Sequence, residues 1–238
     1  MDAGPPRCLA EEALAKLLRA FAAAVFIIWL RDVKRFFREG TRIVAMLGQP
    51  VLYLLIMGQG LRATFRAGMP GVDYVAFVYP GVMGMSVLFT AIFSAVSIIW
   101  DRQFGFLKEV LVAPVPRAAV AVGKALGGST TASFQGLILL SLAPLAGVSL
   151  SLERVIMLSG VLFTLSFAVA SLGVLVAAHM ETMEGFHLVM NFLTLPMFLL
   201  SGAFFPLKTA PTWMQTVMRF DPVYYGVDAL RHLVFAGS

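Results

Sequence analysis

The stretch YVAFVYPGVMGMSVLFTAIFSAVSIIW, from Tyr74 to Trp100, decides the fold. It holds 27 residues with no charged side chain, between Asp73 and Asp101. A helix of about 20 apolar residues crosses the hydrocarbon core of a bilayer, and a soluble domain rarely offers so long an uncharged run. The sequence therefore predicts a transmembrane helix here. Pro80-Gly81 near its start predicts a kink or a tilt.

Four further uncharged stretches are long enough to cross a membrane. They run over 43–61, 125–146, 155–178 and 188–207. The composition agrees, because 59% of the residues are hydrophobic and 13% are charged, against about 25% charged in soluble domains. We therefore expect an all-α integral membrane protein in which residues 43–238 form one membrane domain with five spans.

The N-terminal region 1–42 contains an apolar run, 20–30, that is too short to span a bilayer. A signal peptide is an alternative, but Trp29-Leu30-Arg31-Asp32 lacks the small residues of a cleavage site. The basic residues on both sides favour an amphipathic helix lying in the membrane interface. Four side chains of this helix are expected to reach the acyl chains, namely Phe21, Val25, Ile28 and Trp29.

The distribution of Lys and Arg predicts the orientation. Twelve lie in 1–42 and in the loop after the second span, and six lie on the opposite side. The positive-inside rule therefore predicts a cytoplasmic N-terminus for a multi-pass protein of the plasma (inner) membrane. The net charge of +5 fits loops that face anionic membrane lipids, and no nucleic-acid partner is expected.

Several chemistries are disfavoured by the residues. The only Gly-Lys pair, Gly123-Lys124, is followed by Ala125 and is not a phosphate-binding loop. His179 and His187 flank two glutamates, but a solvated turn explains them better than a metal site. The five spans carry no charged residue, which disfavours an ion-driven carrier. We therefore expect no catalysis, no metal and no cofactor in this chain, and an energy source outside it.

The most informative segment between spans is DRQFGFLKEVLVAPVPR, from Asp101 to Arg117. Its apolar residues recur at helical spacing beside charged ones, and two prolines end the predicted helix. A short amphipathic helix of this kind docks into a groove of a partner protein or rests on the lipid surface. The spacing alone leaves both interpretations open.

Several strings resemble the ABC-2 family of ABC-transporter permeases, especially the daunorubicin-resistance type. The resemblance runs from Gln49 to His232, in the order of the family. It includes the Asp101–Arg117 segment and the strings QPVLYLLIMGQGL from Gln49, YPGVMGMSVLF from Tyr79, GKALGG from Gly123, METMEGFHLVMNFLTLPMFLLSGAFFPL from Met180 and DPVYYGVDALRH from Asp221.

This resemblance implies a homodimeric permease that exports a hydrophobic drug, lipid or glycolipid. The resemblance places ATP and Mg in a separate ATP-binding cassette ATPase subunit. It also implies a cytoplasmic coupling helix that docks on this subunit, and an extracellular re-entrant segment at 208–220. The family has a sixth span, so we expect this chain, which stops at Ser238, to be truncated. The coupling residues would be Phe104, Gly105, Phe106, Leu107, Lys108 and Glu109.

In the family, the translocation path lies at the dimer interface between the second and fifth spans. A single hydroxyl in a span more often bonds its own helix than a substrate, and Asn191 is favoured because an amide in lipid needs partners. The alternatives are an ion-coupled secondary carrier and a membrane assembly protein without transport. The candidate path residues are Thr90, Ser94, Asn191, Ser201 and Phe205.

Overall fold

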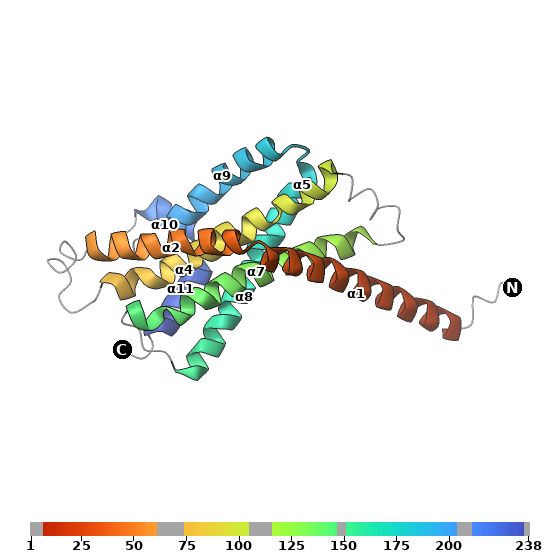
Figure 1. The fold of residues 1–238 in the computed structure, drawn as a ribbon, viewed down its shortest axis with the longest axis horizontal. Coiled ribbons are helices and arrows are strands. Elements are labelled where there is room, and N and C mark those ends of the chain that lie inside the picture. Colours follow the sequence, from red (N-terminus) through yellow and green to blue (C-terminus); the bar gives the residue numbers. More distant parts are fainter. Residues whose placement is uncertain (1–6, 61–73, 105–115, 147–150, 204–210, 236–238) are drawn as a thin grey trace.

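The structure is a computed structural model that describes residues 7–60, 74–104, 116–146, 151–203 and 211–235. Within these ranges every regular element is helical (Figure 1). The elements are α1 (Arg7–Arg38), α2 (Gly40–Gly60), α4 (Tyr74–Ser94), α5 (Val96–Gln103), α7 (Arg117–Ser141), the 3-10 turn η1 (Ala143–Ala146), α8 (Leu152–His179), α9 (Met183–Leu200), α10 (Thr212–Met218) and α11 (Pro222–Phe235).

Three helical segments among the described residues are long and apolar enough to cross a membrane. They are Val78–Gln103, Leu152–His179 and Met183–Leu200, while Ile43–Ile56 in α2 is a shorter apolar helix. The remaining predicted span, 125–146, lies mostly in α7. The prediction of an all-α membrane protein is confirmed.

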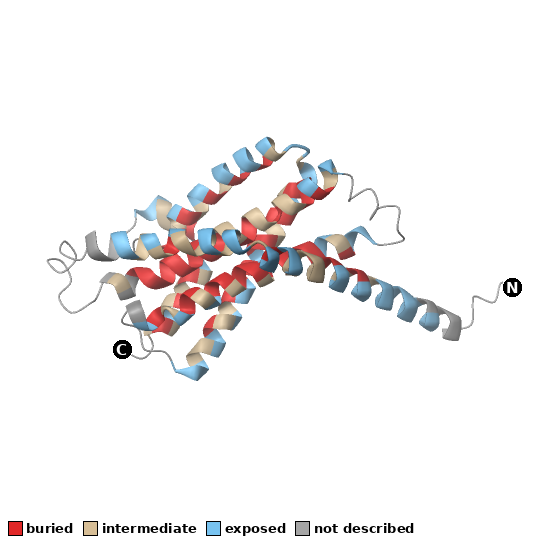
Figure 2. Cartoon of the chain, in the orientation of Figure 1, coloured by how far each residue is buried: buried red, intermediate tan, exposed pale blue. Residues whose placement is uncertain are grey.

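Helix α4 forms the centre of the bundle, and α2, α7, α8 and α11 all pack against it (Figure 1). Its side chains Tyr79, Leu88 and Ile92 are fully buried, and Figure 2 shows that the buried residues gather along the middle of the bundle. The Tyr79 hydroxyl donates a hydrogen bond of 2.6 Å to the carbonyl of Leu139 on α7. Pro80 lies inside α4, and the helix is interrupted further along the chain, at Ala95, so the kink or tilt at Pro80-Gly81 stays a prediction.

The predicted interfacial helix is longer than the apolar run suggested, and part of it belongs to the bundle. Helix α1 has 32 residues, and its second half packs against α7. Ile28 is buried, and the Trp29 indole N–H donates to the hydroxyl of Thr130, 2.9 Å away. The expected contact of Ile28 with lipid is therefore wrong, while Trp29 is half-buried and its contact with lipid stays a prediction. The first half of α1 projects away from the bundle (Figure 1).

Beyond the fifth predicted span, the chain forms two short helices. Residues 208–210 of the predicted re-entrant segment lie outside the described residues, and α10 follows them. Helix α11 packs on α4 and α8 through Val223, Val227, Leu230 and Val234, which are all buried. Asp221 caps α11, since its Oδ1 accepts a hydrogen bond of 2.9 Å from the Val223 N–H. The α11 helix thus completes the packing around the central helix.

Asp221 predicts a pH dependence of stability. Burial raises the pKa of this carboxyl from 3.8 to about 6, although the Val223 N–H lowers it. The folded chain therefore holds the proton more tightly than the unfolded chain. The resulting stabilisation is complete below pH 3.8 and is lost as the pH rises through about 6. The shift of this pKa corresponds to about 3 kcal/mol in the free energy of unfolding.

We expect Asp221→Asn to remove this contribution, because the amide oxygen still accepts the Val223 N–H without titrating. Unfolding of both proteins in detergent at pH 4.5 and pH 8 measures the contribution of Asp221 to stability. The loss of stability between these two values should be smaller in Asp221→Asn than in the wild type, with the variant the more stable at pH 8. Equal losses in both proteins would contradict the assignment.

Candidate functional site

A cavity of about 320 Å³ lies between α2, α4 and α7. Its wall is mostly apolar, from residues such as Met46, Met85 and Phe89, with Thr90 and Gln135 among its polar groups. We call it the α2 cavity. Its mixture of apolar walls and a few polar groups is typical of sites that bind small molecules.

Gln135 connects the three helices around the α2 cavity. Its side chain is buried, and its Nε2 donates to the carbonyl of Met46 on α2 at 2.8 Å. Its Oε1 accepts a short hydrogen bond from the Thr90 hydroxyl on α4. A buried amide is costly without partners, so these bonds fix the positions of α2 and α4 relative to α7.

A second cavity, of about 460 Å³, lies beside the first between α1, α4, α5, α7 and the start of α9. We call it the α1 cavity. Its lining is more polar and includes Arg35, Trp100 and His187. The Arg35 guanidinium lies 5.8 Å from the centre of the Trp100 ring, and His187 stacks on Phe93. Phe93 lines both cavities, so they follow one another along α4.

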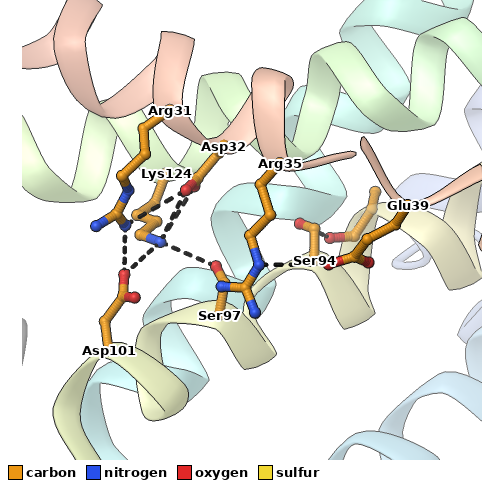
Figure 3. Close-up of polar contacts among 9 residues, drawn as sticks. Arg31, Asp32, Arg35, Glu39, Ser94, Ser97, Asp101 and Lys124 are labelled. Carbon is orange, nitrogen blue, oxygen red and sulfur yellow. Dashed lines mark hydrogen bonds and ion pairs between the residues drawn. The ribbon is translucent and has the colours of Figure 1, made fainter. Parts of the chain in front are cut away.

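Four charged side chains meet at the edge of the α1 cavity (Figure 3). They are Arg31 and Asp32 from α1, Asp101 from α5 and Lys124 from α7, and we call them the charge cluster. Asp101 Oδ2 lies 2.5 Å from Arg31 Nη2 and 2.7 Å from Lys124 Nζ. Lys124 Nζ also lies 3.1 Å from Asp32 Oδ2, and its side chain is only 3% exposed.

The structure brings together two of the candidate path residues. Thr90 lines the α2 cavity and Ser94 lines the α1 cavity, one helical turn apart on α4. The Ser94 hydroxyl also donates to the Ala91 carbonyl at 2.6 Å. Asn191 and Ser201 line neither cavity: Asn191 is exposed on α9, and Ser201 is buried at its end. Phe205 lies outside the described residues.

Of the predicted coupling residues, the structure describes only Phe104. It follows α5 directly, is 75% exposed, and its ring lies 5.4 Å from that of Trp100. Gly105, Phe106, Leu107, Lys108 and Glu109 lie outside the described residues. Next to Phe104, the Arg102 guanidinium donates to the carbonyls of Met180 at 2.7 Å and Ala178 at 3.2 Å. These bonds tie the end of α5 to the end of α8.

The sequence interpretation missed two residues that organise the site. Gln135 lies inside the third predicted span, and an amide in an apolar run is a signal for a partner that we did not use. The hydropathy pattern places Lys124 directly before this span. The helix in fact begins at Arg117, so Lys124 lies inside α7 and is buried. The description of the spans as free of charge is therefore incomplete.

The comparisons with known proteins fit this architecture. The family model of the ABC-2 type transporter matches residues 23–235. The chain belongs to this family. The match begins in α1 and ends in α11, so both cavities and the charge cluster lie within the ABC-2 region.

Several transport permeases are similar to this ABC-2 chain over most of its length. The inner membrane transport permease YadH of Escherichia coli K12 is 26% identical over 223 residues, which is 91% of this chain and 84% of YadH. The transport permease ycf38 of Cyanophora paradoxa is 28% identical over 216 residues, or 90% and 74% of the two chains. YbhR of E. coli K12, whose name describes a multidrug ABC transporter permease, is 28% identical over 171 residues, or 69% and 45%.

Proposed function

We propose that this ABC-2 chain is the membrane subunit of an ATP-driven exporter for a hydrophobic or amphipathic compound such as a drug, lipid or glycolipid. The observation that carries the proposal is the pair of adjoining cavities along α4. The α2 cavity offers apolar walls, and the α1 cavity offers charged and hydrogen-bonding groups. A molecule with an apolar body and a polar end fits such a pair. The name of YbhR supports a drug as one substrate class.

The driving force in this proposal comes from an ATP-binding cassette partner, as the ABC-2 family implies. The exposed Phe104 ring supports a docking surface at the end of α5. The bonds from Arg102 to the end of α8 supply a route by which movement of this surface reaches the long helix α8. ATP and Mg belong to the partner in this scheme, and this chain contributes no catalytic residue.

A second copy of the chain is also part of the proposal. Helix α9 exposes large apolar side chains one turn apart, among them Leu188, Phe192 and Leu195. Asn191 lies beside them, and within the described part of the chain its amide has no hydrogen-bond partner. An unpaired amide at membrane depth is costly. A neighbouring α9 would supply that partner and cover the apolar residues, which supports a homodimer.

The proposed orientation places the N-terminus and the Asp101–Arg117 segment in the cytoplasm. The excess of Lys and Arg on that side supports it. The inner membrane is the proposed location, and the name of the relative YadH supports it. Phe104 and the charge cluster then lie at the cytoplasmic end of the bundle, and the α2 cavity lies deeper in the membrane.

The test is transport by the chain reconstituted with an ATP-binding cassette subunit that co-purifies with it. We expect ATP-dependent efflux of a fluorescent hydrophobic dye, and no ATP hydrolysis by the chain alone. Gly105→Leu and Glu109→Gln should each lower efflux by about tenfold or more, which corresponds to about 1.4 kcal/mol. Expression and ATP hydrolysis should persist, because these changes uncouple rather than unfold.

The matched control is Glu153→Gln, which neutralises an exposed carboxylate at the start of α8 and should leave efflux unchanged. Normal efflux in both Gly105→Leu and Glu109→Gln would refute the coupling assignment. Lack of any ATP-dependent efflux by the wild-type complex, across drug-like and lipid probes, would refute the exporter itself.

One observation favours a second function, an ion-coupled carrier. Such carriers place ionisable groups inside the membrane domain, and the charge cluster contains a buried lysine with two carboxylates. The measurement is uptake by the chain alone, in ATP-free vesicles with an imposed proton gradient. We expect none, because each carboxylate of the cluster is already paired with a cation. Gradient-driven uptake would replace the exporter proposal.

A further inference from the structure

Lys124 lies where α1, α5 and α7 meet. Its ammonium group is within 3.2 Å of three acceptors: the Asp32 carboxylate on α1, and the Ser97 hydroxyl and Asp101 carboxylate on α5. An ammonium group has three N–H donors, so these acceptors use its full capacity. Its position relative to all three helices is thus fixed by directional bonds.

The glycines of the GKALGG string bring the helices together at this point. A Cβ at Gly123 would lie 2.9 Å from the Cβ of Ile28, and one at Gly127 would lie 3.0 Å from the Cβ of Asp32. These glycines are one turn apart and face α1, as in the small-residue contacts between membrane helices. A larger side chain at Gly127 would push Asp32 away from Lys124, and one at Gly123 would push Ile28 of the same helix away from α7.

The charge cluster connects both sides of the segment between α5 and α7. Asp101 lies three residues before Phe104, and Lys124 lies in the second turn of α7 after Arg117. Arg31 on α1 pairs with Asp101 and so joins α1 to the end of α5. A force applied to the segment therefore meets one bonded unit, made of the end of α5, the start of α7 and the second half of α1.

We propose that the charge cluster is a rigid joint, in which Lys124 is a positioning residue that makes these three helices move together. The joint deepens the proposed function, on which it rests for the origin of the force. A buried ion pair adds little stability compared with an apolar contact. Its bonds have fixed directions, however, so they hold the helices in one relative position, whereas two apolar surfaces can slide past each other. All three helices line the α1 cavity, together with α4 and the start of α9, so movement of the joint would change the shape of this cavity.

The first test measures the joint in the permease without its partner. Spin labels on Gln103→Cys and Ala118→Cys, both exposed on the flanks of the segment, report the distance between α5 and α7 in a Cys8→Ser background. The joint predicts a narrow distance distribution. The charge-balanced variant Asp101→Asn/Lys124→Gln should at least double its width. An unchanged width would overturn the proposal.

The second test uses the complete complex with the ATP-binding subunit. Asp101→Asn/Lys124→Gln should retain ATP hydrolysis within about twofold while efflux falls about tenfold or more. A purely structural role would lower both together. The control Asp228→Asn/His232→Gln removes an exposed pair on α11 and should behave as the wild type. Normal efflux in the Asp101 and Lys124 variant would overturn the joint.

Two further outcomes keep the tests distinct. If the wild-type complex transports nothing but the distance distribution widens as expected, the exporter proposal fails and the joint stands. If the double variant does not fold, Ser97→Ala removes only the 3.0 Å bond to Lys124 and keeps all four charges. It should widen the distribution to an intermediate degree, and an unchanged distribution would again overturn the proposal.

Discussion

Lys124→Met is expected to lower the free energy of unfolding by about 3–5 kcal/mol, the range found when one partner of a buried ion pair is removed. Methionine fills the space of the lysine stem, so the loss comes from charge and not from a cavity. Arg31 would remain as the only cation of the cluster beside Asp32 and Asp101. Both carboxylates are mostly buried, so water cannot replace the missing ammonium group fully.

A second change distinguishes this cause from a packing defect. Asp101→Asn in the Lys124→Met background removes the uncompensated charge, and most of the lost stability should return. Unfolding in detergent by heat or by denaturant, in a double-mutant cycle, measures the coupling between the two positions. Lys16→Met, on the exposed first half of α1, should change stability by less than about 0.5 kcal/mol. A Lys124→Met protein as stable as the wild type would contradict the charge argument.

The helices were largely predictable from the sequence because lipid imposes a simple rule. A backbone in hydrocarbon must satisfy its own hydrogen bonds, so long uncharged runs such as 155–178 become helices such as α8. The rule fails where protein replaces lipid as the environment. Lys124 was treated as the limit of a span, but inside the bundle Asp32 and Asp101 compensate its charge. The same rule wrongly places Ile28 of α1 in lipid, because α7 and not lipid covers this residue.

The candidate site was predictable only in part. Thr90 and Ser94 were selected as polar residues of the second span, and they line the two cavities. Their partners were not predictable. Gln135 reaches Thr90 only because α7 is oriented about its axis so that this side chain faces α4. That rotation depends on which small residues face which neighbour, and a single sequence does not specify these pairings. The same polarity rule selects Asn191, yet this residue is exposed and lines neither cavity.

The second large effect concerns the contact between α4 and α8. A Cβ at Gly173 would lie 2.8 Å from the carbonyl oxygen of Ile92 and 3.2 Å from the Cβ of Ala95. The Ile92 carbonyl is backbone and cannot rotate away as a side chain can. We therefore expect Gly173→Leu to lower the free energy of unfolding by about 3 kcal/mol or more, at the upper end of overpacking effects.

Gly160→Leu is the matched control for this prediction. Gly160 lies on the same helix, is exposed, and has no neighbouring atom within 4 Å of an added Cβ. The same substitution there should leave stability nearly unchanged, and thermal unfolding of both variants in one detergent makes the comparison. Because α4 also lines both cavities, the displacement of Ile92 by Gly173→Leu should reduce transport in any protein that still folds. Equal unfolding temperatures for the two variants would mean that the close contact between Gly173 and Ile92 does not hold α4 in place.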